Sequence, residues 1–247
     1  MNLFYDLYFQ SAMSTVTGLS SITKFGSNLD IDTNSDPETI WSSGGLYQFP
    51  SSASQISIVS SSSDDTSTGT GARTVLVQGL DENYNEIEET FTLNGVSAVT
   101  SSSSSWIRAH RAKVLSAGTG EVNAGTITIT HGALTLATIP ADFGQTQMAV
   151  YTIPAKKRGF IKSFSGALVR GSTLLSNGQA TLAMYFRKNG VISVQQEIQI
   201  SVSGLNTFQK TYPIPIVADE KTDIYINCLQ VSNNNTGVFA DFQLVLT

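Results

Sequence analysis

One stretch of the sequence repeats oxygen-bearing side chains at the spacing of a calcium-binding loop. These side chains occupy positions one, three, five and seven of an EF-hand pattern, and they belong to Asp30, Asp32, Asn34 and Asp36. The pattern also requires glycine at its sixth position and glutamate at its twelfth, where this chain has Ser35 and Trp41. The stretch is therefore a candidate for a partial calcium site, and the alternative is a solvated acidic segment.

The residues that could support hydrolysis are few. The chain has two histidines, His110 and His131, which are too few for a zinc site of three histidines. Glu88 and Glu89 are neighbours on a predicted strand, so they point to opposite faces and do not suit a paired-carboxylate mechanism. We therefore expect a protein that is not an enzyme and has no cofactor. The single cysteine, Cys228, excludes an internal disulfide, and we expect it to be buried and inert.

Basic side chains gather in two places. The first is the segment with Arg108, His110, Arg111 and Lys113, and the second is the run at 156–158, Lys-Lys-Arg. In a chain of net charge −5, both are candidates for contact with an acidic surface, and the alternative is an ordinary solvated face. The net charge disfavours a nucleic-acid partner, because such binding depends on clustered Lys and Arg. No apolar run is long enough for a membrane helix, so no membrane contact is expected either.

The elements that carry these residues are predicted to be β-strands. Only 13% of residues are charged, and Ser and Thr are frequent, which suits sheets with exposed hydroxyl side chains. Two strands at 74–80 and 87–93 flank a polar turn, and the second alternates apolar and polar residues. Asn189-Gly190 predicts a two-residue hairpin of the I′ type. The fold class expected is all-β, with two antiparallel β-sandwich domains, of which the C-terminal one is jelly-roll-like.

The domain boundaries follow from turn signals and composition. Residues 1–12 contain Leu-Tyr-Phe-Gln-Ser at 7–11, which matches the core of a tobacco etch virus protease site, so we interpret them as an expression-tag remnant. The alternative is a native arm with the aromatic residues Phe4, Tyr5, Tyr8 and Phe9. An extended arm is expected over 13–50, a first β-sandwich over 51–140 and a second over 146–247. The arm has isolated apolar anchors that cannot form a core of their own and are expected to make interactions: Phe25, Ile31, Trp41 and Phe49.

Apolar residues on both faces of the C-terminal strands predict a partner surface. Residues 182–186 are consecutive and apolar, so alternation cannot place all of them on one inner face. We therefore expect a symmetric homo-oligomer held through the C-terminal domain.

Several stretches together resemble a family of virion structural proteins of tailed bacteriophages, of the marine and cyanophage type. The stretches are turns and strands, and they are residues 24–26, 30–33, 40–41, 44–45, 64–66, 69–75, 77–81 and 92–95. The resemblance covers residue 13 to about residue 150, and the region after it is similar only in its all-β character. It brings no catalytic residues with it.

The resemblance implies a structural role on the virion, reached through the host cytoplasm during assembly. The leading expectation is a protein that decorates or stabilises the capsid exterior, with the major capsid protein as partner and a homotrimer as its assembly. The alternative is a tail or fibre protein that binds a receptor or a host surface glycan. Trp106 and Tyr84 are the aromatic candidates for sugar contact in the first domain.

Overall fold

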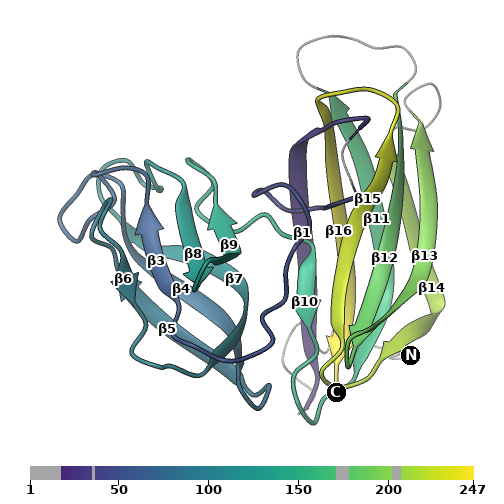
Figure 1. Cartoon of the computed structure of the whole chain (residues 1–247), viewed down its shortest axis with the longest axis horizontal. Helices are drawn as coiled ribbons and strands as arrows, with labels where there is room; N and C mark the ends of the chain where they lie inside the picture. Colours follow the sequence, from purple (N-terminus) through teal and green to yellow (C-terminus); the bar gives the residue numbers. More distant parts are fainter. Residues whose placement is uncertain (1–17, 35–36, 171–177, 202–206) are drawn as a thin grey trace, which may run out of the picture. The chain divides into compact units, whose positions relative to one another are not determined.

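The computed structural model describes residues 18–34, 37–170, 178–201 and 207–247, and in these ranges the regular structure is entirely antiparallel β (Figure 1). The described residues include no helix, and so none that could cross a membrane. The prediction of an all-β chain is confirmed. The strands are β1 (Ser20–Ile31), β2 (Glu38–Thr39), β3 (Ser57–Ser60), β4 (Ala72–Asp81), β5 (Glu86–Thr92), β6 (Val99–Thr100), β7 (Trp106–Ala117), β8 (Ile127–His131), β9 (Leu134–Ile139), β10 (Val150–Thr152), β11 (Gly159–Arg170), β12 (Gln179–Lys188), β13 (Val191–Ser201), β14 (Thr207–Ala218), β15 (Asp223–Val231) and β16 (Thr236–Leu246).

The chain divides into two compact units. The terminal unit combines residues 18–25 and 29–40 with residues 149–247, and the central unit consists of residues 41–148 with 26–28. The first predicted domain lies within the central unit. The predicted C-terminal domain differs from the terminal unit because it lacks the N-terminal strands.

The terminal unit contains two sheets. Their strand orders are β1-β16-β11-β14 and β10-β15-β12-β13, and β2 pairs with β15 in the second sheet. One apolar cluster takes side chains from both sheets, for example Phe164 and Phe242 from the first and Leu182 and Ile226 from the second. The two sheets therefore share one core.

The segment expected to be an arm differs from the expectation. Residues 20–31 form a twelve-residue strand, β1, beside β16, and residues 38–39 pair with β15. β1 is hard to predict from the sequence because Lys24, Ser27 and Asn28 are buried although they are polar. A strand with buried polar residues, some of them consecutive, lacks the apolar alternation by which half-buried strands are recognised.

The central unit also contains two sheets, with strand orders β6-β3-β8-β9 and β5-β4-β7. The predicted hairpin is present as β4 and β5, with Val75 opposite Phe91. Phe91 is buried while Glu88 and Thr90 are exposed, so the predicted alternation is confirmed.

The turns follow the side-chain chemistry expected of them. Asn189 and Gly190, between β12 and β13, have φ angles of 52° and 79°, which is the left-handed pair that a I′ turn requires. In the β4–β5 connection, Asp81 Oδ1 accepts hydrogen bonds from the backbone N–H groups of Asn83 and Asn85, each at 2.8 Å. Both turns are thus set by local residues.

Candidate functional site

The predicted calcium stretch serves to hold a loop of the terminal unit. Asp32 Oδ1 accepts a hydrogen bond from Asn235 N at 2.9 Å, and Thr33 donates from both its N and its Oγ1 to Asn234 Oδ1. Asp30 is exposed on β1, while Asp36 lies outside the described residues. The described side chains include no cluster of three or more metal-binding acids, histidines or cysteines. Asp32 is a hydrogen-bond acceptor for the turn before β16.

The four arm anchors lie at different depths. Ile31 belongs to the apolar core of the terminal unit, and Trp41 is buried in the central unit. Trp41 Nε1 donates to Gly45 O at 3.0 Å, and its ring meets Tyr47 edge to face at 5.0 Å between centroids. Phe25 and Phe49 are half-buried. Two of the four anchors are therefore core residues of their own chain.

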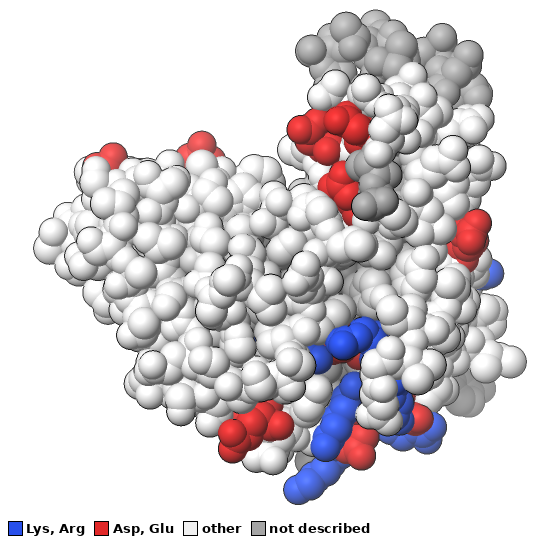
Figure 2. All heavy atoms as spheres, viewed as in Figure 1, with Lys and Arg blue, Asp and Glu red and all other residues white. Residues whose placement is uncertain are grey.

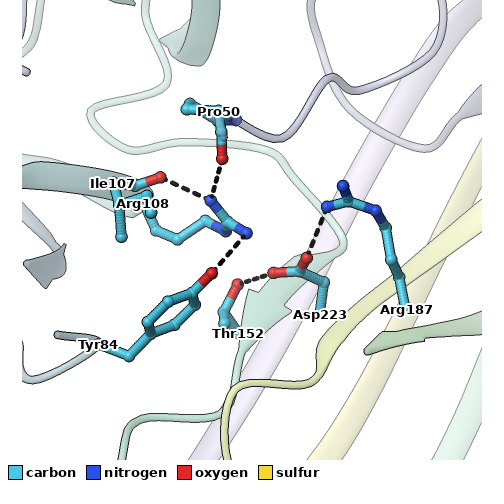
Figure 3. Close-up of polar contacts among 7 residues, drawn as sticks. All are labelled: Pro50, Tyr84, Ile107, Arg108, Thr152, Arg187 and Asp223. Carbon is cyan, nitrogen blue, oxygen red and sulfur yellow. Dashed lines mark hydrogen bonds and ion pairs between the residues drawn. The ribbon is translucent and has the colours of Figure 1, made fainter. Parts of the chain in front are cut away.

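The basic segment on β7 is only partly a surface feature. Arg108 is 3% exposed, and its Nη1 donates to Pro50 O at 2.9 Å and to Ile107 O at 2.8 Å (Figure 3). Its guanidinium also lies 5.1 Å from the centroid of the Phe49 ring and 5.5 Å from that of Tyr84. Both alternatives considered for Arg108, an external acidic contact and a solvated position, are therefore wrong, because two rings and two carbonyl groups surround this cation inside the chain.

The other basic positions on β7 differ in exposure. His110 and Arg111 are half-buried, and only Lys113 is exposed. His131, the second histidine, ends β8, and its Nε2 is buried without a hydrogen-bond partner among the described residues. Neither the basic segment nor the histidines thus form a continuous charged face.

The second basic run pairs with acids of its own unit. Arg158 lies 3.4 Å from Asp219, and Lys188 lies 3.1 Å from the other oxygen of the same carboxylate. The carboxylate of Glu220 accepts a hydrogen bond from Lys156 N at 2.5 Å. Figure 2 shows blue and red atoms intermixed near one end of the terminal unit. The charges of Arg158 and Lys188 are thus paired with Asp219, whereas Lys156 contacts Glu220 through its backbone N–H.

The Asp65 carboxylate accepts four hydrogen bonds inside the central unit. The residues around it in the sequence did not predict this role. Its Oδ1 accepts from Ala72 N at 2.7 Å and from Ala124 N at 2.8 Å. Its Oδ2 accepts from Ser60 Oγ at 2.6 Å and from Gly125 N at 2.9 Å. The side chain has no exposed surface, so this one carboxylate joins its own loop, between Ser60 and Ala72, to the distant segment at 124–125.

A second buried acid lies in the terminal unit. Asp223, at the start of β15, accepts from Thr152 Oγ1 at 2.6 Å and from Arg187 Nη1 at 3.0 Å (Figure 3). Asp223 is buried and Arg187 is partly exposed, so the pair connects the interior of the sheet to its surface. These contacts support strand packing between β10, β12 and β15.

Cys228 lies on β15 in the core of the terminal unit. Burial raises the pKa of its thiol to about 12, although hydrogen bonds with the backbone of Gln230 and Thr181 partly oppose this. The thiol therefore stays protonated at neutral pH, and the prediction of a buried cysteine is confirmed.

The aromatic candidates for sugar binding are not free platforms. Trp106 has no exposed surface, and Tyr84 packs against Arg108. A small polar cavity of about 60 Å³ does occur in the terminal unit, beside β12, β13 and β15. Its lining is mainly amide and hydroxyl side chains: Gln179, Ala180, Thr181, Gln199, Gln230, Val231 and Ser232. The volume suits one or two water molecules, which is much less than a sugar ring.

The fold places the protein in the all-β class. Comparisons with known proteins do not narrow this class further. No family model matches the chain, and a search of curated proteins found no match. Among solved structures, the chain is similar to the VP2 subviral particle of infectious bursal disease virus, with 13% identity over 92% of this chain and 75% of that one, at a TM-score of 0.19. Particles of T=1 symmetry derived from the same virus give 11% identity over 92% and 77%, at a TM-score of 0.12. Similarities this low carry no argument about function.

Proposed function

We propose that the protein is a structural component of a bacteriophage virion, built on a jelly roll. The observation that carries the proposal is the strand order of the terminal unit. Counted along the chain without the short β2, its eight strands form sheets in the orders first–eighth–third–sixth and second–seventh–fourth–fifth. These are the orders of a jelly roll with two Greek keys, an architecture found in capsid proteins and lectins.

The central unit is, in this proposal, a second β-sandwich inserted between the first two jelly-roll strands. Its two sheets, β6-β3-β8-β9 and β5-β4-β7, have their apolar residues inside, including Val77, Trp106 and Ile129. An insertion at such a connection adds a second folded body while the strand order of the jelly roll is kept. Two folded bodies in one chain suit a decoration protein, in which one body can bind the particle and the other can be exposed.

The particle site we propose is the capsid exterior, with the major capsid protein as partner. The resemblance of residues 13 to about 150 to phage virion proteins supports this location. The buried acids described above favour a structural role, because Asp65 and Asp223 have their hydrogen-bond capacity taken up by structural partners. We infer a non-enzymatic protein that acts as an oligomer and needs no cofactor.

One observation favours a second candidate, a tail or fibre protein that binds a host glycan. Gln199, Thr181 and Gln230 lie side by side on three neighbouring strands, at the cavity of the terminal unit. Amide and hydroxyl side chains in a row can bond sugar hydroxyl groups. The cavity itself would hold only one hydroxyl-sized group of a glycan, so this candidate comes second.

Gold labelling of intact phage particles tests the proposal. Antibodies against the purified chain are expected to label the head, and particles lacking the protein serve as the control. Label confined to the tail or fibre tips would favour the glycan-binding alternative. In that case glycan binding should fall in the variant Gln199→Ala/Gln230→Ala and persist in Gln243→Ala, an exposed glutamine of β16. Absence of the protein from washed particles would contradict both the proposed capsid location and the tail or fibre alternative.

A further inference from the structure

Two short strands of the terminal unit follow each other along the same side of β15. β2 pairs with residues 227–228 of β15, and β10 pairs with residues 223–225. Both pairings are antiparallel, so β2 and β10 run in the same direction. Only Ile226 of β15 lies between the two paired stretches, and β2 therefore ends where β10 begins.

Ile226 divides its backbone hydrogen bonds between two residues that are far apart in the sequence. Its carbonyl oxygen accepts from Ile40 N at 2.8 Å, and its N–H donates to Ala149 O at 3.2 Å. In a regular antiparallel ladder, a residue exchanges both bonds with one residue on the opposite strand. Here the N–H of that opposite position belongs to Ile40, directly after β2, and the C=O belongs to Ala149, directly before β10.

The other two backbone groups of this pair of residues bond each other. They are the N–H of Ala149 and the C=O of Ile40, with 2.9 Å between nitrogen and oxygen. Both side chains have no exposed surface, and both belong to the core cluster of the terminal unit. A chain in which one residue took the place of both would therefore satisfy Ile226 and leave none of these backbone groups unpaired.

The side chains alternate regularly when Ile40 and Ala149 are counted as one strand position. This position, Tyr151 and Ile153 belong to the core cluster, whereas Val150 does not. Successive residues of a strand point to opposite faces of the sheet. Direct joining of Ile40 to Val150 would thus keep Tyr151 and Ile153 on the core face.

The border between the two compact units falls at the same place. Ile40 and Ala149 belong to the terminal unit, and the next residues, Trp41 and Met148, belong to the central unit. Trp41 and Met148 form an antiparallel bridge, so the two ends of the central unit are neighbours. Among the described residues, the core cluster of the terminal unit includes none from 41–148.

We propose that β2 and β10 are two parts of one edge strand, which the central unit interrupts at a single position, and that the terminal unit folds and unfolds independently of residues 41–148. The pairing of Ile226 and the composition of the core carry this inference. Residues 26–28, which are grouped with the central unit, are Gly-Ser-Asn and remain part of β1 when 41–148 are absent. The inference does not depend on the proposed virion role.

Hydrogen exchange of the full chain in increasing urea tests the independence of the two units. Asp65→Ala removes an acceptor inside the central unit. It is expected to lower the urea midpoint of exchange for β3–β9 and to leave β2 and β10–β16 at their wild-type midpoints. Phe164→Ala, in the core of the terminal unit, should have the reverse effect. Midpoints of both units that move together in either variant would overturn the proposal.

A shortened chain tests the single edge strand directly. Deletion of residues 41–149 joins Ile40 to Val150 and gives the strand one residue at each position opposite β15. This chain is expected to unfold cooperatively, with the urea midpoint that the terminal unit has in the full chain. Loss of cooperative unfolding would contradict the proposal.

A second shortened chain, one residue longer, is the matched control. Deletion of residues 41–148 keeps Ala149 as well as Ile40, so two residues compete for the position opposite Ile226. The extra residue either forms a bulge or shifts the register and turns Tyr151 out of the core, and the urea midpoint is expected to be lower than in the first chain. A midpoint equal to or above that of the first chain would show that β2 and β10 are not parts of one strand.

Discussion

The two units of this chain are stabilised in different ways. In the central unit, loops are held by buried polar groups, chiefly Asp65, Asn123 and Arg108, each of which bonds backbone atoms from distant segments. In the terminal unit, long strands share one large apolar core, and apolar side chains of β13 and β14, such as Val191 and Ile214, are exposed.

The difference indicates separate tasks for the two units. A body whose loops are bound to central polar groups keeps its shape without a partner, because its backbone donors are satisfied internally. A body with an apolar strip on one side leaves part of its burial to be completed by association. We therefore propose that the central unit is exposed on the particle and that the terminal unit makes the contacts of assembly.

The largest effect is expected from removing the carboxylate of Asp65. Asp65→Ala leaves the N–H groups of Ala72, Ala124 and Gly125 without their acceptor inside the central unit. The loss in free energy of unfolding should be about 4 kcal/mol, since several buried donors lose a charged partner. Urea denaturation measures it. The neighbouring Asp64→Ala, at an exposed position, should stay within about 0.5 kcal/mol of the wild type.

Replacement of Arg108 should have the next largest effect. Arg108→Ala removes the donor to Pro50 O and Ile107 O and the cation between the rings of Phe49 and Tyr84. We expect a loss of about 3 kcal/mol, measured by thermal and urea unfolding. Lys113→Ala, on the same strand but exposed, serves as the control. If Arg108→Ala and Lys113→Ala were equally stable, the conclusion that buried polar side chains hold the loops of the central unit would be wrong.

A smaller effect is expected at the β4–β5 turn. Asp81→Ala removes the acceptor for the N–H groups of Asn83 and Asn85 and should cost about 1 kcal/mol. Burial raises the pKa of Asp81, but the hydrogen bonds from Asn85 and Asn83 outweigh it, so the pKa lies below its usual value. The stabilisation is therefore present above the ordinary pKa near 3.8 and is lost as the pH falls below it. Unfolding curves of Asp81→Ala and wild type should converge in strong acid.

The smallest expected change in the free energy of unfolding is a gain in stability, and it concerns the terminal unit. Burial raises the pKa of Asp241, and a hydrogen bond with Ser165 only partly opposes this. The folded state thus favours the protonated acid, and stability falls as the pH rises through the raised pKa. Asp241→Asn should stabilise the protein by about 0.5 kcal/mol at pH 7 and by less below pH 4. Asp219→Asn should do the opposite, because Lys188 and Arg158 lower the pKa of Asp219.

The sequence predicted most strands because alternation and turn residues are local signals. The β4–β5 hairpin and the Asn189-Gly190 turn are examples, since side chains within a few residues determine both. β1 was not predicted because Lys24, Ser27 and Asn28 are polar although they are buried, so the strand has no apolar alternation.

The buried polar side chains that hold the loops of the central unit could not be predicted from the sequence. Asp65 reads as part of a Ser-Asp loop, and its partners at Ala72, Ala124 and Gly125 are backbone groups that any residue provides. Arg108 was taken for a surface cation because the rings of Phe49 and Tyr84 lie far from it in the chain. The excess apolar surface predicted at residues 182–186 was wrong, because these residues of β12 are buried or half-buried within the chain, and the exposed apolar side chains lie on β13 and β14 instead.

Hydrogen exchange of the full chain at increasing protein concentration tests the contrast between the units most directly. The account predicts that amides of β13 and β14 exchange more slowly as concentration rises, because the exposed apolar side chains of these strands become covered in the proposed oligomer. The amides of Ala72, Ala124 and Gly125, bonded to Asp65, should be protected equally at every concentration. Exchange in β13 and β14 that does not depend on concentration, or fast exchange around Asp65, would contradict it.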